Sequence, residues 1–443
     1  HEEIFRQEGW HYEMEDRDSD LTINGVVYNE MKGAFSNPDD VLERQIMNSL
    51  FPDTTYGIES GGDPKVIPEL TRENYLDFHR HYYHPVNSYI YLYGNMDFEE
   101  RLNYLDQEYL SNYDAIDVDS HIDIQAPFDS MHEIKTYYPV SENQDLSGQT
   151  YLSKNMVVGN ALDLERVGAF EALEYALLSA PGAPLQKELL SAGICKDVTG
   201  GFDSGTLQPT FSITIKGSDE DKREEFLSIV DRVLKEQVAK GIDKKSLEAS
   251  INNSEFRFRE ADFGGYPKGL IYGLNMMETW LYDENEPFAV LHSLDVYKSL
   301  REKLTTNYFE ELIQKELIEN THASMVIVAP EAGLTGKEDA ALQAKLNQYR
   351  DTLTAEEIQT IVDETKALKE YQSEPETEEA MKTIPVLKRE DLRKEARPFT
   401  YHLKHYGRVD VLHTDIETNG ILYLIYSFRN VRLSTLDIPV LAF

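Results

Sequence analysis

Cysteine is nearly absent from this sequence, which has Cys195 as its one cysteine among 443 residues. A single thiol excludes an intrachain disulfide and a cysteine-rich metal cluster. A catalytic thiol is not expected either, because Cys195 ends a helical pattern, LLSAGICKDV, where a small buried packing residue is the commoner case. The scarcity of cysteine fits a reducing compartment, so we expect a cytoplasmic protein.

Long hydrophobic runs and basic residues are also scarce. No apolar stretch approaches the roughly 18–20 residues that cross a bilayer, so no membrane span is predicted. Eighty acidic against 43 basic residues give a formal net charge of −37, which disfavours phosphate backbones and argues against a nucleic-acid partner. Two interpretations of this acidity stay open: it keeps the protein soluble, or it lines a chamber that attracts basic peptides.

The two ends of the sequence are unusual. It starts at His1 rather than Met and stops at Phe443 inside the apolar run LDIPVLAF. These features predict an interior piece of a longer protein, whose missing N- and C-terminal parts would be its partners. Any targeting segment would lie upstream of His1.

The first 130 residues read as helices joined by a Gly- and Pro-rich loop. A helical pattern covers residues 25–50, and Pro38 predicts a kink or a second helix start within it. A loop follows, and a capped helix opens at Thr71. The run SYIYLYGN, residues 88–95, predicts a β-strand.

This helix-then-strand unit recurs later in the chain. Residues 70–95 align with residues 304–330: each has an L-T start, an aromatic-bearing amphipathic helix and an apolar run. The recurrence favours two related α/β domains in tandem, although chance similarity stays open. Between the copies, strands are predicted at 151–158 and within 200–216, and helices at 162–179 and 222–239.

The last quarter of the chain changes character. Residues 336–392 are rich in Glu, Lys and Gln and predict an αα-hairpin that connects rather than catalyses. Residues 407–428 then predict a β-hairpin that turns at Thr418-Asn419-Gly420.

Four segments together carry a resemblance to a known family. They are GVVYNEMKGAFSNPDD from Gly25, DFGGYPKGLIYGLNMMETWLYD from Asp262, the connector KALKEYQSEPETEEAMKTIPVLKREDL, and ETNGILYLIYSF from Glu417. In combination they resemble the presequence-protease branch of the pitrilysin (insulinase) family of zinc metallopeptidases, over nearly the whole chain. The resemblance implies an α+β fold of tandem related α/β domains joined by a helical-hairpin connector.

The same resemblance implies a division of the chain. Residues 1–130 would be the distal part of a first peptidase domain, and residues 131–330 a second, non-catalytic domain. Residues 331–396 would be the connector, and residues 397–443 the start of a third domain. In the family, four such domains close over an internal peptide-binding chamber.

The resemblance also implies a zinc site. The family's H-x-x-E-H helix supplies two His ligands and a Glu general base, and a Glu within N-E-M-K-G completes the set. By this resemblance Glu30 would be that Glu, but no H-x-x-E-H or H-E-x-x-H occurs in this sequence. We therefore expect a zinc-dependent endopeptidase that degrades unstructured peptides, of which this chain alone, with no catalytic residue, is inactive.

The alternative for Glu30 is a solvated side chain on a helix. The apolar neighbours Val26, Val27, Tyr28 and Met31 predict instead that its carboxylate lies beside a buried face, where an unpaired charge is costly. The alternative function is a catalytically dead homologue that acts as a structural or peptide-binding partner. An upstream H-x-x-E-H would distinguish the two functions.

Two weaker candidates concern substrate binding. Ser60 begins the loop SGGDP, which we expect at the rim of the active site. Tyr266, in GGYPKGL, would offer a hydrogen bond from the chamber wall, or belong to a tight turn before a helix.

Clustered histidines are not expected to bind metal. His79, His81 and His84 lie at a helix end, but residues two apart point to different helix faces, and the helix dipole accounts for them. His402 and His405 fall where strand patterning begins, so a metal role is not predicted there either.

Overall fold

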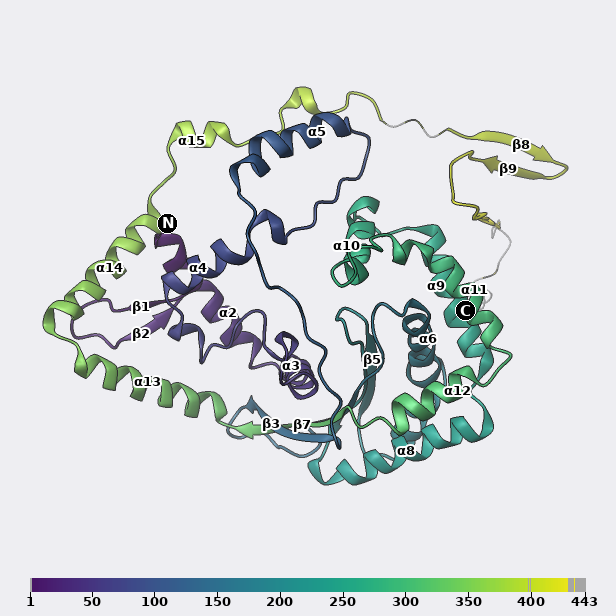
Figure 1. The fold of residues 1–443 in the computed structure, drawn as a ribbon, viewed down its shortest axis with the longest axis horizontal. Coiled ribbons are helices and arrows are strands. Elements are labelled where there is room, and N and C mark those ends of the chain that lie inside the picture. The colour runs from purple at the N-terminus through teal and green to yellow at the C-terminus, as the bar shows by residue number, and fades with distance from the viewer. Residues whose placement is uncertain (1, 397, 399, 429–433, 435–443) are drawn as a thin grey trace.

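A computed structural model describes residues 2–396, 398, 400–428 and 434. The predicted mixed α/β fold is confirmed: helices surround one five-stranded sheet in the lower part of the molecule (Figure 1). No helix in the described part of the chain is long and apolar enough to cross a membrane.

The sheet is assembled from strands far apart in the sequence, in the order β3-β7-β4-β6-β5. The pair β3–β7 is parallel, and the other neighbours are antiparallel. The strands are β3 (His132–Val140), β4 (Thr150–Val157), β5 (Asp197–Asp203), β6 (Thr210–Ser218) and β7 (Ala323–Ala332). The strands predicted at 151–158 and within 200–216 are therefore confirmed.

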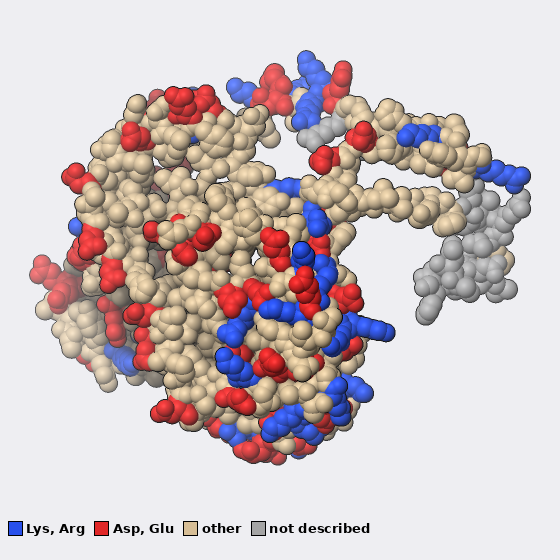
Figure 2. Space-filling model, turned by 45° about the vertical axis from the view of Figure 1, so that its right-hand side comes forward, with Lys and Arg blue, Asp and Glu red and all other residues tan. Residues whose placement is uncertain are grey.

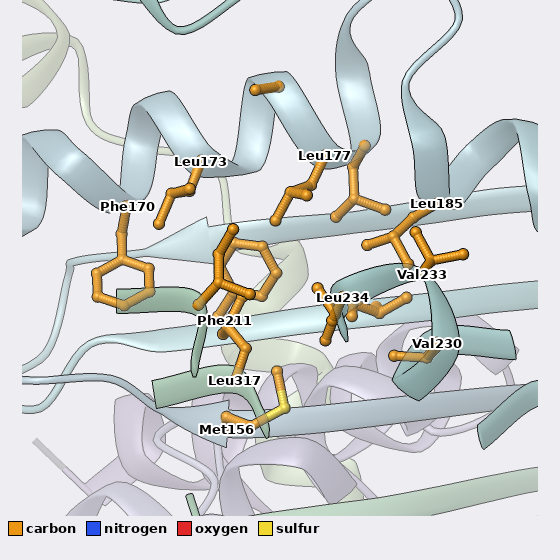
Figure 3. Close-up of a cluster of buried hydrophobic side chains, with 14 of the residues drawn as sticks. Met156, Phe170, Leu173, Leu177, Leu185, Phe211, Val230, Val233, Leu234 and Leu317 are labelled. Carbon is orange, nitrogen blue, oxygen red and sulfur yellow. The ribbon is translucent and has the colours of Figure 1, made fainter. Parts of the chain in front are cut away.

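One face of the sheet carries the main hydrophobic core. Phe170, Leu173 and Leu177 point from a helix onto Phe211 of β6, and Val230 lies on a second helix below them (Figure 3). These two helices are the predicted ones, α6 (Leu164–Glu174) with its continuation η7 (Tyr175–Ser179), and α8 (Arg223–Lys240). Next to them lie α9 (Lys244–Glu260) and α11 (Ser293–Lys303), which were not predicted.

The opposite face of the sheet, which helix α3 (Pro38–Leu50) covers, carries both apolar and hydroxyl side chains: Val41 and Leu42 of α3 pack on valines of β7. Ser49 Oγ of α3 donates to Ser324 Oγ of β7 at 2.8 Å, and Ser153 Oγ lies 2.7 Å from Thr214 Oγ1. These buried hydroxyls are satisfied by one another. Since α3 packs on β3, β7 and β4, the same face of β5 and β6 is left without a helix above it.

A buried histidine joins α3 to the sheet. His322 Nε2 donates to the carbonyl oxygen of Leu50 at 2.8 Å, and the ring of Phe51 packs edge-on against it. Burial lowers the pKa of His322, which favours the neutral imidazole. The end of α3 is thereby held against the start of β7.

The N-terminal helices form largely as predicted. The long pattern splits at Pro38 into α2 (Val26–Ala34) and α3, and Asn37 caps α3 by accepting the Asp39 N–H at 3.0 Å. Thr71 opens α4 (Arg72–Tyr82) with a capping box. The helix α5 (Phe98–Tyr104) follows.

The strand predicted at residues 88–95 is wrong. The segment is extended, but among the described residues no strand pairs with it. Its alternate tyrosines pack instead on α10 (Lys268–Trp280): Tyr89 lies 4.7 Å from Trp280 between ring centroids, and Tyr93 lies against Gly269. In the second copy of the repeat the apolar run does form a strand, β7, because β7 pairs with a strand on each side. An apolar alternating run becomes a strand only where another strand accepts its hydrogen bonds.

The connector is a helical hairpin, as predicted. Helices α13 (Leu334–Thr352) and α14 (Ala355–Ser373) run along the left-hand edge in Figure 1, and a short helix, α15 (Glu378–Thr383), follows. The hairpin packs on the small sheet of β1 (His11–Glu13) and β2 (Thr22–Asn24). That contact buries Met14, Leu21, Leu346 and Val362.

The C-terminal hairpin lies earlier than predicted. Strands β8 (His402–Tyr406) and β9 (Val409–His413) turn at Gly407, whose φ of 63° suits a tight hairpin turn. A turn does form at 418–420, with the Ile421 N–H bonded to Thr418 O at 3.0 Å. Residues 421–428, however, pair with no described strand, so the predicted hairpin across that turn is wrong.

Limited digestion with trypsin should cut first after helix α14, which ends at Ser373. The described residues between Glu374 and Leu412 are exposed almost throughout and include Lys382 and Lys388. The sheet domain between β3 and β7 is protected by its buried core and should persist. Mass spectrometry of the early fragments tests this, and first cuts inside residues 132–332 would contradict it.

Candidate functional site

Glu30 lies on the exposed side of α2. The helix starts after Gly25, where a Cβ would fall 2.2 Å from the carbonyl oxygen of Gly9, so only glycine fits. Tyr28 is the buried anchor of the helix. Glu30 is exposed, and its carboxylate has no hydrogen bond or ion pair with any described residue.

The expectation that Glu30 lies beside a buried face is wrong. Val26 and Val27 are 50% and 38% exposed and face outward with Glu30, whereas Met31 is half-buried. The physical reason is that Tyr28 alone turns inward, and Glu30 is two residues further along, on another side of the helix. The carboxylate is therefore available to a ligand or partner.

Two contacts fix the position of α2. Lys32 Nζ forms an ion pair with Asp339 Oδ1 of α13 at 2.7 Å, and this hydrogen bond raises the pKa of Lys32. On the other side, a Cβ at Gly61 would fall 2.5 Å from Met31 Sδ, so the loop packs tightly on Met31. The connector and the loop thus hold the helix that carries Glu30.

A cavity of about 660 Å³ opens beside this helix, between α2, α3 and the loop at residues 55–60. It is referred to below as the α2–α3 cavity. It includes Ser60, the predicted rim residue, and Met31, the neighbour of Glu30. Its lining residues are Met31, Ala34, Phe35, Asp40, Glu43, Arg44, Met47, Thr55, Tyr56, Gly57, Ile58, Glu59 and Ser60.

The α2–α3 cavity is lined by more acidic than basic side chains. Arg44 donates to Asp63 at 2.6 Å and stacks on Phe35, with its guanidinium carbon 4.1 Å from the ring centroid. Burial favours neutral Asp63, but hydrogen bonds from the Lys65 N–H and Arg44 outweigh it and hold the pKa of that carboxyl below its usual value. Arg44 is thus already neutralised by a residue outside the cavity lining.

A second cavity, of about 580 Å³, lies on the other side of α3, over the uncovered face of β5 and β6. Glu43 and Met47 line both cavities, so α3 is their common wall. In the second cavity Asp39 is paired with Lys216 of β6 at 2.5 Å. On the face drawn in Figure 2, acidic side chains are spread widely, with basic ones interspersed in the lower part.

The loop at residues 55–60 is tied to the sheet domain. The hydroxyls of Tyr56 and Tyr282 share a hydrogen bond, and Tyr56 also accepts the Leu207 N–H at 3.3 Å. Burial and the bond to Tyr56 raise the pKa of Tyr282. The walls of the α2–α3 cavity are therefore fixed from both sides.

The structure does not bring Tyr266 to these cavities. It is 66% exposed in a turn before α10, closed by its N–H bonding to Phe263 O at 3.2 Å. His79, His81 and His84 are spread along and after α4, and His405 Nδ1 bonds to Asp410 at 2.7 Å across β8 and β9. Within the described residues, no group of three or more His, Cys, Asp or Glu could hold a metal ion.

Sequence analysis did not identify most of the residues that line the α2–α3 cavity. Phe35, Arg44 and Met47 gave no motif, because their proximity depends on how α2, α3 and the loop pack together. One signal of the cavity was available in the sequence. Met31, Phe35 and Met47 are apolar residues within helical segments that also carry many charged residues.

Comparison with known proteins identifies the family. The chain is 45% identical over 429 residues to protein HypA of Clostridium perfringens, and 34% identical over 427 residues to presequence protease 1 of Arabidopsis thaliana. Residues 69–254 match the model of the peptidase M16 inactive domain, and residues 328–443 match that of the region associated with subfamily C of the M16 peptidases. The chain belongs to the pitrilysin family of M16 peptidases. The predicted presequence-protease-like branch is thereby confirmed.

This M16 chain spans only part of its relatives. The matches cover 97% of the chain but 44% of HypA, and 95% of the chain but 39% of the Arabidopsis protein. In fold, it resembles the M16 inactive domain of Pseudomonas fluorescens, with a TM-score of 0.52, 18% identity and 69% of each chain covered. A protease from Helicobacter pylori has a TM-score of 0.53 at 16% identity, covering 69% of this chain and 70% of the other.

The residues around Glu30 can be compared with the ligands that a zinc site requires. M16 peptidases are generally zinc-dependent. Glu30 has the right chemistry for one ligand, since an exposed carboxylate without a protein partner is free to bind a cation. The described residues supply no set of three around it. Among the described residues, Glu30 alone therefore offers one possible ligand, and a catalytic zinc site would need further ligands that these residues do not supply.

Proposed function

We propose that this chain contributes the zinc ligand Glu30 and a peptide-binding wall to a zinc metalloendopeptidase. The enzyme would degrade unstructured peptides inside a closed chamber. The observation that carries the proposal is an unpartnered carboxylate on α2, the helix whose Met31 and Ala34 line the α2–α3 cavity. The names of the relatives, which are presequence proteases, support the class of reaction.

Zinc, when bound, would activate water for attack on a peptide carbonyl. The residues of this chain have a positioning task. Tyr28 anchors α2 from below, and the ion pair of Lys32 with Asp339 ties it to the connector. Glu30 is thereby presented from a fixed helix rather than from a loop, which favours a defined ligand geometry.

The alternative function is a catalytically dead homologue that holds peptides. The match of residues 69–254 to a domain model described as inactive fits both functions, because the active enzyme is also expected to contain a non-catalytic domain. An H-x-x-E-H motif in the longer protein, or its absence, separates the two functions.

The 443-residue chain by itself should neither bind zinc stoichiometrically nor hydrolyse peptides. Glu30 supplies one ligand where a catalytic site needs three, and metal affinity depends on ligands placed together. Zinc is measured by elemental analysis after dialysis, and cleavage of an unstructured basic peptide is followed with and without chelator. Stoichiometric zinc with chelator-sensitive cleavage would reveal a metal site other than the one proposed.

A further inference from the structure

The turn at residues 418–420 has a composition that makes its backbone chemically reactive. It contains Asn419 followed by Gly420, and the sequence has one other Asn-Gly pair, Asn24-Gly25. In such a pair the backbone nitrogen of the glycine can attack the side-chain amide carbon of the asparagine, because no Cβ obstructs its approach. Both pairs share this intrinsic reactivity, so their surroundings decide how fast each one reacts.

The surroundings of Asn419 leave the reaction open. Asn419 and Gly420 are exposed, and their φ angles of 53° and 81° lie in the left-handed region. The turn is closed by the Ile421 N–H, which donates to Thr418 O at 3.0 Å. The Gly420 N–H donates to no described residue. Its proton is therefore open to removal by solvent, which the attack requires.

The second Asn-Gly pair is held by hydrogen bonds. Asn24 lies in strand β2 and is half-buried. The Gly25 N–H donates to Asn24 Oδ1 at 2.8 Å, and the same oxygen accepts a hydrogen bond from Asn29 Nδ2 at 2.7 Å. Asn24 Nδ2 donates to Glu13 Oε2 at 2.7 Å. These bonds must break before the Gly25 nitrogen can reach the amide carbon, so the fold protects this pair.

The side chain of Asn419 also joins the turn to helix α9. Asn419 Nδ2 donates to the carbonyl oxygen of Arg259, in the last turn of α9, at 3.0 Å. Carbonyl groups in the last turn of a helix have no partner within the helix, so an external donor satisfies this one. The hydroxyl of Tyr423 donates to Glu260 Oε1 at 2.7 Å. The turn is thus attached to the end of α9 by two hydrogen bonds.

We propose that Asn419 is a deamidation site and that its conversion releases the turn from α9. The nitrogen of Gly420 forms a bond to Cγ of Asn419, the bond from Cγ to Nδ2 breaks, and the proton of Gly420 leaves with ammonia. Water then opens the resulting succinimide ring at either carbonyl. The products are aspartate and isoaspartate at position 419. The net reaction consumes one water and releases one ammonia, so no oxidant or reductant is needed.

Both products lose the contact with α9. A carboxylate has no hydrogen to donate to Arg259 O. It is also repelled by the partial negative charge at the C-terminal end of the helix and by Glu260. Isoaspartate adds a methylene group to the backbone, which disrupts the bond between Thr418 and Ile421. This inference goes beyond the proposed function, because it involves neither zinc nor peptide cleavage.

The reaction is measured on the 443-residue chain, kept at mildly alkaline pH and physiological temperature and analysed by peptide mass spectrometry. Replacement of the amide by a carboxylic acid is read from the mass of each Asn-Gly peptide. In the folded chain, Asn419 should react at least about tenfold faster than Asn24. In concentrated urea the two should react at similar rates, because only the fold protects Asn24.

A substitution tests the release. Asn419→Asp reproduces one product, and chymotrypsin should cut it within residues 421–428 at least about threefold faster than the unsubstituted chain, because cleavage requires local detachment. Asn253→Asp is the matched control. It places the same charge on an exposed residue of α9, away from the end of the helix, and should leave the cleavage rate unchanged. Circular dichroism checks that both variants are folded.

Three results would overturn the proposal. The first is deamidation of Asn419 that is no faster than that of Asn24 in the folded chain. The second is cleavage of the Asn419→Asp variant at the rate of the unsubstituted chain, and the third is an equal acceleration in Asn253→Asp. None of these results bears on the zinc role of Glu30, because no measurement uses metal or enzymatic activity.

Discussion

Replacing Glu30 by Gln in the longer protein should lower both bound zinc and peptide hydrolysis at least about tenfold. Glutamine keeps the size of the side chain and its reach for hydrogen bonds but removes the charge that holds the metal. Because Glu30 makes no bond to any other described residue, the change should leave the fold intact. Zinc content per protein and initial rates on an unstructured peptide are the two measurements.

The matched control is Glu73→Gln, which changes an exposed glutamate in the first turn of α4, away from both cavities. It should leave zinc and turnover at the wild-type values. Full zinc occupancy with unaltered turnover in Glu30→Gln would remove Glu30 from the ligand set. Equal losses in both variants would instead indicate a general electrostatic effect of the acidic surface.

Phe211→Ala should lower the free energy of unfolding of the sheet domain by about 3–5 kcal/mol. Phe211 has no exposed surface, and its ring centroid lies 6.1 Å from that of Phe170, at the centre of the core between β6 and α6. Truncation removes the burial of the ring and leaves a cavity that the rigid sheet cannot close. Urea denaturation should show a lower midpoint at an unchanged slope.

Phe288→Ala serves as the comparison, because Phe288 is 57% exposed. Its effect on the free energy of unfolding should be within about 0.5 kcal/mol. Similar losses for Phe211 and Phe288 would mean that the core is not where the structure places it. The pair therefore tests the packing of the sheet domain independently of any activity.

The sequence predicted the elements that local signals control. Pro38 split the first helical pattern, Thr71 capped α4, and the apolar face of α8 became buried, because caps, prolines and helical periodicity act within a few residues. The family was also readable, because its motifs are contiguous strings. The zinc role of Glu30 and the domain boundaries at residues 131, 331 and 397 stay predictions.

Errors occurred where distant partners decide the outcome. Residues 88–95 have the alternation of a strand, yet they lie on α10 as an extended segment without a partner strand. The hairpin expected around Asn419 formed at Gly407 instead. Apolar neighbours predicted a partly buried Glu30, and the packing of α2 through Tyr28 turned it to solvent.

The amino-acid sequence by itself determined the family, the mixed α/β class, the helices with strong caps and the strong negative charge, because each depends on nearby residues or on composition. Only the tertiary structure decided the strand order β3-β7-β4-β6-β5, the exposure of Glu30 and the joining of Met31, Glu43 and Ser60 around one cavity. The physical reason is that strands pair and cavities form between segments far apart in the chain. Their contacts depend on how whole helices and sheets pack, and no local pattern encodes that packing.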